Sequence, residues 1–271
     1  MAKIFNGFLF LLLFSRLGIS QEQNQITYIA NEGVFIEYEG TKVYIDVLHQ
    51  KYKHSLYQFT RTPYRLKLIA GEGPFEEVDL MLVTHLHGDH IHIGDTKELL
   101  ANNPKTILMT SQQVLDSIGL VGYQTNQLYA IQPEDRGLTF QMQGLDIQTF
   151  PLIHSYKQRN HAIVNTAYLL DFEGLTILHV GDPELTEENL KRINKAVGKG
   201  VDYALLPDWF FAQGDYLSKL KKNIKAKKYI AMHVITTKDG LYERKLKRRV
   251  KDLGIDLNVF LRVGETEPLK K

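Results

Sequence analysis

The sequence predicts an α/β fold in which two packed mixed β-sheets are flanked by helices, a four-layer αββα sandwich. Three observations support this prediction. Apolar runs of strand length occur in both halves of the chain, helical patterns alternate with them, and no Ser/Gly/Pro-rich linker divides residues 21–271. With 271 residues, 44% of them hydrophobic, the chain is long enough to bury such a core as a single domain over residues 21–271.

The first twenty residues have the pattern of an export signal. Lys3 supplies a positive start, Phe8–Phe14 (FLFLLLF) forms an apolar centre, and small residues follow. We therefore expect a cleaved signal peptide over residues 1–20 and an exported protein, periplasmic or secreted. A stable transmembrane anchor is not expected, because the uncharged run Ile4–Phe14 has 11 residues and a spanning helix needs about 20.

Three predicted strands open the domain, at residues 26–30, 34–38 and 42–47, and the turn Glu39-Gly40 joins the last two as a hairpin. Residues 48–77 show no clear period and predict a long irregular loop. Further strands are expected at residues 78–83, 106–109, 147–153, 166–170, 175–180, 203–206 and 229–232. Helices are expected at residues 96–101, 112–118, 184–197, 215–224 and 241–253.

Charge and cysteine content restrict the function classes. Without residues 1–20 the chain has equal numbers of basic and acidic residues, and no nucleic-acid partner is expected. Residues 219–251 hold 13 Lys or Arg against two acidic residues, either as a solvated helix face or as a surface for an anion. The absence of cysteine excludes disulfides, cysteine nucleophiles and thiolate metal ligands.

A cluster of ligand-type side chains follows the apolar run that ends at Val83. His85 and His87 are two residues apart, so they point the same way at the end of a strand. Asp89 and His90 follow Gly88, which frees the backbone to turn. Imidazole and carboxylate are ligands for zinc and neighbouring metals, so the cluster predicts a metal site.

The segment Thr84–His90 (THLHGDH) resembles the HxHxDH signature of the metallo-β-lactamase fold superfamily. The family's later ligands also have matches at predicted strand ends. These are His154 in FPLIHS, Asp182 in ILHVGD and His233 in IAMH. The opening strands, including Asp46 in VYID, and Val201–Pro207 are similar as well, so the resemblance covers nearly all of residues 21–271.

The resemblance implies the metallo-β-lactamase fold and a centre with two divalent metal ions, with zinc expected and manganese or iron as alternatives. His85, His87 and His154 would hold one ion, Asp89, His90 and His233 the other, and Asp182 would bridge them. A metal-bound hydroxide would attack the substrate. Asp89 would both ligate and orient this nucleophile as a catalytic residue, and Asp46 would support a ligand.

The other histidines are weaker candidates. His161 lies in a polar stretch shortly after His154, so we predict that it contacts substrate or transfers a proton as a second catalytic residue. His49 and His54 lie in the predicted loop, His92 follows the motif as a surface or ligand-supporting residue, and His179 is expected to pack in a strand.

Departures from other branches narrow the resemblance. The absence of cysteine argues against class B1 and B2 β-lactamases, Asp182 against class B3, and His87 against flavodiiron oxygen reductases. The setting of His154 differs from that in glyoxalase II. The pattern is most similar to the branch of the L-ascorbate-6-phosphate lactonase, although Asp208–Phe211 (DWFF) replaces a small turn. These aromatic residues could line an apolar pocket or pack in the core.

The sequence therefore predicts a metal-dependent hydrolase that cleaves a phosphoester, lactone or amide bond of a small-molecule or lipid-like anionic substrate. Two alternatives remain: a non-catalytic metal-binding module on the same fold, and a di-iron redox protein.

Overall fold

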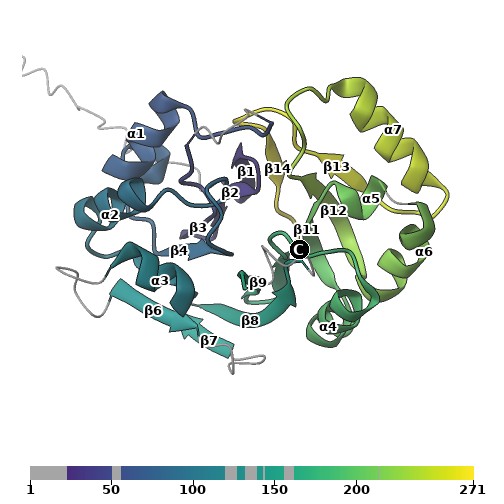
Figure 1. The fold of residues 1–271 in the computed structure, drawn as a ribbon, viewed down its shortest axis with the longest axis horizontal. Coiled ribbons are helices and arrows are strands. Elements are labelled where there is room, and N and C mark those ends of the chain that lie inside the picture. Colours follow the sequence, from purple (N-terminus) through teal and green to yellow (C-terminus); the bar gives the residue numbers. More distant parts are fainter. Residues whose placement is uncertain are drawn as a thin grey trace, which may run out of the picture.

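The computed structural model describes residues 23–50, 56–119, 127–131, 139–142, 144–155, 162–212 and 214–271. The predicted four-layer sandwich is confirmed: two seven-stranded sheets in the described residues pack face to face, with helices outside them (Figure 1). The predicted signal peptide, residues 1–20, lies outside the described residues. Within those described ranges, no helix combines the length and apolar character required to cross a bilayer.

The first sheet carries its helices on one side of the molecule. Its strand order is β14 (Thr266–Pro268), β1 (Gln25–Ala30), β2 (Gly33–Tyr38), β3 (Thr41–Ile45), β4 (Leu80–Val83), β5 (Ile107–Ser111) and β6 (Leu128–Ile131). The covering helices are α1 (Thr62–Ala70), the 3-10 turn η1 (Gly73–Phe75), α2 (Ile93–Asn102) and α3 (Gln112–Ile118). Strands β3 to β6 run parallel, so their C-terminal ends lie at one edge.

The second sheet mirrors this arrangement. Its strand order is β13 (Leu257–Val259), β12 (Ala226–Met232), β11 (Val201–Pro207), β10 (Leu175–His179), β9 (Val164–Phe172), β8 (Leu145–Ile153) and β7 (Thr139–Met142). The covering helices are α4 (Glu187–Val197), α5 (Trp209–Ala212), α6 (Gly214–Asn223) and α7 (Gly240–Lys251). Strands β10 to β13 run parallel, and β8 shares their direction because β8 and β10 are both antiparallel to β9.

Burial on both faces of a strand explains its continuous apolar sequence. In β4 (LMLV), Leu80 and Leu82 pack between the two sheets, while Met81 and Val83 pack under the helices of the first sheet. Burying each such side chain contributes about 1.5–3 kcal/mol. The strand that leads to the histidine cluster is therefore held from both sides.

Most predicted elements are present, and the Glu39-Gly40 hairpin turn is confirmed, with φ angles of 47° and 82° that fit a type I′ turn. The prediction of an irregular loop over residues 48–77 is wrong in part, because α1 and η1 lie there. Pro63 in the first turn and Gly71, with φ 65°, bound α1, which buries only Leu68 and Ile69. So short an apolar stripe gives little periodic signal.

The short elements β6, β7, α5, β13 and β14 were also not predicted. They have three or four residues each, and some of the strands among them are defined by partners far along the chain. For example, β14 pairs with β1 at the opposite end of the sequence. A pattern in one short segment cannot show such pairing.

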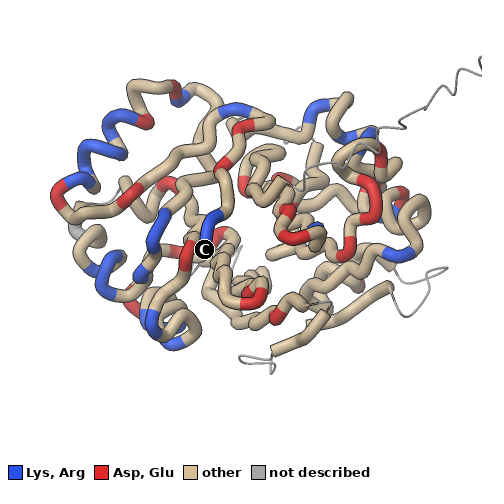
Figure 2. Tube along the Cα trace, turned by 180° about the vertical axis from the view of Figure 1, so that it is seen from behind, with Lys and Arg blue, Asp and Glu red and all other residues tan. Residues whose placement is uncertain are grey.

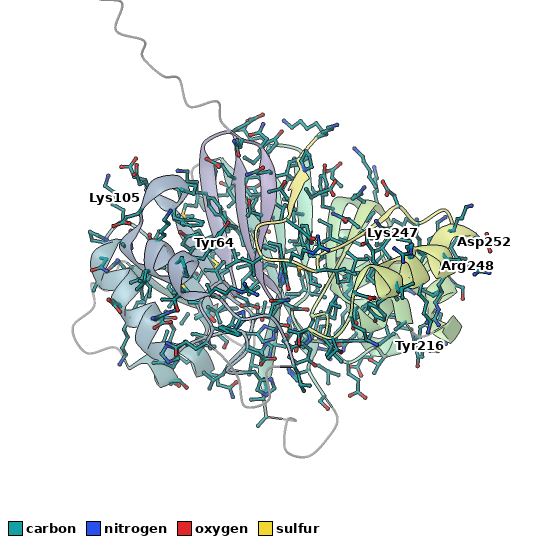
Figure 3. All side chains as sticks on the ribbon, turned by 90° about the horizontal axis from the view of Figure 1, so that it is seen from above. Tyr64, Lys105, Tyr216, Lys247, Arg248 and Asp252 are labelled. Carbon is teal, nitrogen blue, oxygen red and sulfur yellow. The ribbon has the colours of Figure 1, made fainter. Side chains whose placement is uncertain are left out.

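The basic run at residues 219–251 lies mainly on α6 and α7, away from the sheets. Figure 2 shows Lys and Arg along these outer helices, and Figure 3 shows Lys247 and Arg248 projecting outward from α7. Only Leu246 and Val250 of α7 are buried, and Lys247 pairs with Glu243. The structure therefore favours the interpretation as a solvated helix face.

A buried hydrogen bond between the two sheets allows this packing to be tested. The buried Tyr168 hydroxyl on β9 donates to the carbonyl of Val83 at 2.7 Å and lies 3.3 Å from that of Met109. We expect Tyr168→Phe to lower the free energy of unfolding by about 1–2 kcal/mol, measured by denaturant unfolding. Tyr129→Phe on β6, where the side chain is 41% exposed, is the control and should change it by less than about 0.5 kcal/mol. Equal effects would contradict the role of this bond.

Candidate metal centre

The structure brings all seven predicted metal ligands to one edge of the sandwich. His85, His87, Asp89 and His90 follow β4 of the first sheet, and His154, Asp182 and His233 follow β8, β10 and β12 of the second. This edge holds the C-terminal ends of strands from both sheets, where α/β proteins commonly place their ligands.

Three imidazoles form the first group. The Nδ1 atom of His87 lies 3.0 Å from Nε2 of His85 and 3.1 Å from Nε2 of His154. One nitrogen from each ring lies within 4.8 Å of the others. Burial lowers the pKa of His85 well below its usual range and that of His154 to about 4, so these rings are neutral near pH 7 and present lone pairs to a cation.

Asp89, His90 and His233 form the second group, again with ligand atoms within 4.8 Å of one another. Asp182 lies between the groups. Its Oδ2 atom is 2.9 Å from Nε2 of His233 and 3.3 Å from Nε2 of His90, and it also forms a possible metal-holding set with His85 and His90. Asp182 is thus positioned to contact ions in both groups.

The two histidines of the second group are held in their protonated form by neighbouring carboxylates. Burial would lower the pKa of His233, but the carboxylates of Asp182 and Asp89 raise it to about 9. Burial likewise opposes protonation of His90, and Asp182 and Asp46 raise its pKa well above the usual range. In return, burial would raise the pKa of Asp89, but the close imidazolium of His233, 3.6 Å away, and the charge of His90 lower it to about 2.

The donor set fits metal ions. Five buried atoms of the ligand residues have no hydrogen-bond partner within the described part of the chain: Nε2 of His90, Nδ1 of His154, Oδ1 of Asp182, and both ring nitrogens of His233. The contacts of Asp182 with the two histidines are within ion-pair distance but lack hydrogen-bonding geometry. Buried polar groups are almost always paired, and imidazole and carboxylate donors satisfy zinc, manganese or iron.

Asp46 supports the ligand His90 through a side-chain contact, as predicted. Its Oδ2 atom lies 2.8 Å from Nδ1 of His90, and its carboxylate accepts hydrogen bonds from the backbone N–H and the hydroxyl of Thr84. These bonds direct Nε2 of His90 toward Asp182 and raise the basicity of the ring.

Unusual backbone conformations also hold the site in place. Asp46 and His233 have φ angles of 49° and 56°, in the left-handed region that side chains other than glycine rarely adopt. Gly181, before Asp182, has φ 63°, and a Cβ there would lie 2.9 Å from Cβ of Thr84. Glycine is needed because β10 and β4 approach closely here.

Sequence reasoning missed Glu32, which lies in the turn between β1 and β2. Its side chain is fully buried, with a carboxylate oxygen within 4.8 Å of Asp46 and His90 ligand atoms. Burial, followed by the charge of Asp182, raises the pKa of Glu32 well above its usual range. In the sequence, Glu32 stands between the predicted strands at residues 26–30 and 34–38, and no pattern there indicated this position.

Two aromatic side chains border His233. The ring centroid of Tyr57 lies 4.1 Å from that of His233, and the Trp209 ring lies 5.1 Å away. Trp209 donates its indole N–H to the carbonyl of Pro183, whereas Phe210 and Phe211 are fully buried in the core. Of the three aromatic residues in the DWFF segment, only the tryptophan therefore borders the site. Tyr57 belongs to the segment predicted as a loop, where no pattern singled it out.

Of the other histidines considered in the sequence, three have structural roles and two lie outside the described residues. His179 is buried and its Nε2 lies 3.0 Å from the carbonyl of Glu32, as expected for a packed residue. His49 is buried against the carbonyl of Ala30, and His92 caps α2 through the backbone N–H of Asp95. Of these three, none belongs to the described ligand groups. His54 and the predicted catalytic residue His161 lie outside the described residues.

Comparisons with known proteins agree with this geometry. Residues 25–233, which include all seven ligands, match the family model described as the beta-lactamase superfamily domain. A UPF0173 metal-dependent hydrolase of Saccharolobus solfataricus is 32% identical over 130 residues, which are 48% of this chain and 52% of the relative. A UPF0173 metal-dependent hydrolase of Thermococcus kodakarensis is 30% identical over 163 residues, which are 59% of this chain and 68% of the relative.

The matched segment thus spans about half the length of the Saccharolobus solfataricus relative. Among solved structures, a metallo-beta-lactamase fold protein from Bacillus subtilis aligns with a TM-score of 0.65 and 14% identity. The alignment covers 91% of this chain and 99% of that protein. At 14% identity, the similarity shows that the two proteins share a fold.

The charged second group predicts a pH-dependent metal affinity. A metal ion must displace the protons of His90 and His233. Because the pKa of His233 is about 9, this residue keeps its proton throughout the neutral pH range. We therefore expect zinc affinity, measured by competition with a chromogenic chelator and corrected for the chelator's own titration, to increase steadily from pH 6 to 8.5. Asp182→Asn removes the charge that raises both pKa values, so it should flatten this dependence. A wild-type affinity that is constant over this range would contradict the ion-pair network.

Proposed function

Because this chain belongs to the metallo-β-lactamase superfamily and, within it, to the UPF0173 metal-dependent hydrolases, we propose that it is a hydrolase with a dinuclear metal centre. Its substrate in this proposal is a small-molecule or lipid-like anion with a phosphoester, lactone or amide bond. The observation that carries the proposal is the position of Asp182, which lies 2.9 Å from His233 and has a carboxylate oxygen within 4.8 Å of ligand atoms of both His85 and His90.

In this proposal, His85, His87 and His154 would hold one ion, Asp89, His90 and His233 would hold the other, and Asp182 would contribute to both. Two divalent ions in these places would lower the pKa of a shared water and polarise the oxygen of the scissile group. Zinc is the proposed metal, with manganese and iron as alternatives.

The chain's own residues would handle the proton and the developing charge. Asp89 stays ionised at neutral pH, since its pKa is about 2, and its carboxylate can accept a hydrogen bond from the attacking water and orient it. Burial and the charges of Asp182 and Asp89 raise the pKa of Tyr57 to about 12. The hydroxyl therefore stays protonated and can donate to an oxygen that becomes negative in the transition state.

The aromatic border suggests how a substrate would lie. Tyr57 and Trp209 flank His233, so an apolar part of the substrate would rest beside the second ligand group while the charged part meets the metal ions. A lactone is one candidate substrate because the sequence is similar to the L-ascorbate-6-phosphate lactonase branch.

We also propose that the chain acts outside the cytoplasm, because it has the apolar run Phe8–Phe14 and contains no cysteine. N-terminal sequencing of the protein from its host would test this.

The two alternatives predict different metal behaviour. A non-catalytic metal-binding module would keep the ions but turn over no substrate. A di-iron redox protein would retain iron and change its optical spectrum on reduction. The presence of all seven ligands in one place favours catalysis over a module that binds metal without turnover.

Metal content and hydrolysis together test the proposal. We expect about two ions per chain by elemental mass spectrometry after reconstitution with zinc, manganese or iron. Asp182→Ala should lose at least one ion and reduce hydrolysis of chromogenic phosphodiester, lactone or amide substrates by more than roughly 100-fold. Asp202→Asn is the matched control, because this buried carboxylate on β11 bonds Thr176 and Lys227 instead. A wild-type chain that binds no metal would overturn the dinuclear mechanism.

Tyr57 provides an independent test of the transition-state contact. Tyr57→Phe keeps the ring against His233 and removes the hydroxyl, so kcat should fall about tenfold or more with little change in KM. Tyr57→Ala also removes the ring and should raise KM. Both variants should keep the wild-type metal content, and Tyr129→Phe serves as the control. A Tyr57→Phe variant with wild-type kcat would remove the hydroxyl from the mechanism.

A further inference from the structure

The turn between β1 and β2 is joined by hydrogen bonds to two residues of the metal centre, Asp89 and His233, and also contacts the buried His179. Asn31 donates its side-chain N–H to the carbonyl of Asp89 at 3.1 Å, and its own carbonyl accepts from the backbone N–H of His233 at 3.1 Å. The carbonyl of Glu32 lies 3.0 Å from Nε2 of His179. The turn therefore fixes the position of Glu32 relative to ligands from both sheets.

The carboxyl group of Glu32 is the unexplained feature of this turn. Its side chain is fully buried, and neither carboxyl oxygen has a hydrogen-bond partner among the described residues. Its neighbours are Asp182, Asp46 and His90. A buried acid beside two other acids is unfavourable unless positive charge is close, and an amide or apolar side chain would fill the same space without this cost.

The positive charge of the proposed metal ions explains why an acidic residue is buried at this position. Two divalent ions carry four positive charges, while the proposed ligands include only two carboxylates, Asp89 and Asp182. Asp46 and Glu32 are the two further buried carboxylates that lie within 4.8 Å of the ligand atoms of His90. When all four carboxyl groups are ionised, their charge matches that of two divalent ions in a region of low dielectric constant.

We propose that Glu32 is a positioning residue of the metal centre, whose negative charge acts on the neighbouring ligands Asp182 and His90 and balances the charge of the ion bound by the second group. This inference rests on the dinuclear centre proposed above. Glu32 acts through these two ligands, and its loss would affect the second ion while leaving the group of His85, His87 and His154 intact.

The test compares metal binding with stability in Glu32→Gln, which keeps the size and removes the charge. We expect the dissociation constant of the second zinc ion, measured by chelator competition, to rise tenfold or more, while the first ion binds as in the wild type. The melting temperature of the zinc-free variant should be equal to or higher than that of the zinc-free wild type, because crowding of acids is relieved. A merely structural residue would show the reverse, with a lower melting temperature and unchanged zinc binding.

Two further variants complete the test. Glu32→Asp keeps the charge and should bind the second zinc ion more tightly than Glu32→Gln does. Asp202→Asn removes a buried carboxylate that is bonded to Thr176 and Lys227, so it should lower the melting temperature without changing zinc binding.

The outcomes separate the two proposals. If the wild type binds two zinc ions and Glu32→Gln binds both with wild-type affinity, the role of Glu32 is overturned and the dinuclear centre stands. If Glu32→Gln fails to fold, Glu32→Asp and Glu32→Ala replace it in the test. A Glu32→Asp variant that binds the second ion as tightly as the wild type supports the need for negative charge. A Glu32→Ala variant with wild-type affinity for that ion overturns the role of Glu32. A wild type that binds no second ion refutes the dinuclear centre itself.

Discussion

A buried carboxylate stays ionised only beside positive charge, and Asp182 meets this condition in a way that organises the whole site. In the ion-free protein it pairs with the imidazolium forms of His233 and His90, at 2.9 and 3.3 Å. Its charge is the largest favourable contribution to the raised pKa of both histidines. The same charge attracts cations, which would replace the two protons. The pairing therefore keeps the ligands together until metal binds, and binding exchanges one kind of positive charge for another.

The scaffold makes this exchange possible because the ligands cannot move far. Strands β4, β8, β10 and β12 are buried in the sandwich, and each places its ligand within one to seven residues of its end. Across the sheets, the backbone N–H of Thr166 donates to the carbonyl of Thr84 at 2.9 Å, and Gly181 lets β10 approach that segment. A site preorganised in this way needs little rearrangement on binding, which preserves the affinity gained from each ligand.

The site also costs stability, as functional sites often do. Left-handed backbone at Asp46 and His233, unpartnered ring nitrogens, and the crowded acids Glu32 and Asp182 are each unfavourable in the ion-free protein. The three hydrophobic clusters, between the sheets and under each helical layer, offset this cost. Metal binding would then stabilise the folded chain by mass action.

Much of the fold and most of the ligands could be read from the sequence, for a local physical reason. Apolar runs such as Leu80–Val83 are the direct consequence of burial on both faces of a strand. The spacing of His85, His87, Asp89 and His90 places several ligands at one strand end. Resemblance to a known family then supplied His154, Asp182 and His233, whose separation along the chain no periodicity could bridge.

Tertiary structure alone decided which residues surround those ligands. Glu32 reads as part of a hairpin turn and Tyr57 as part of a loop, because their roles depend on packing against segments far away in the sequence. Edge strands such as β14 are likewise defined by a distant partner. The sequence by itself thus determined the chemistry of the ligand set and the layered fold. The electrostatic environment of the ligands arises only when the ends of strands from both sheets converge, since charge acts through space and not along the chain.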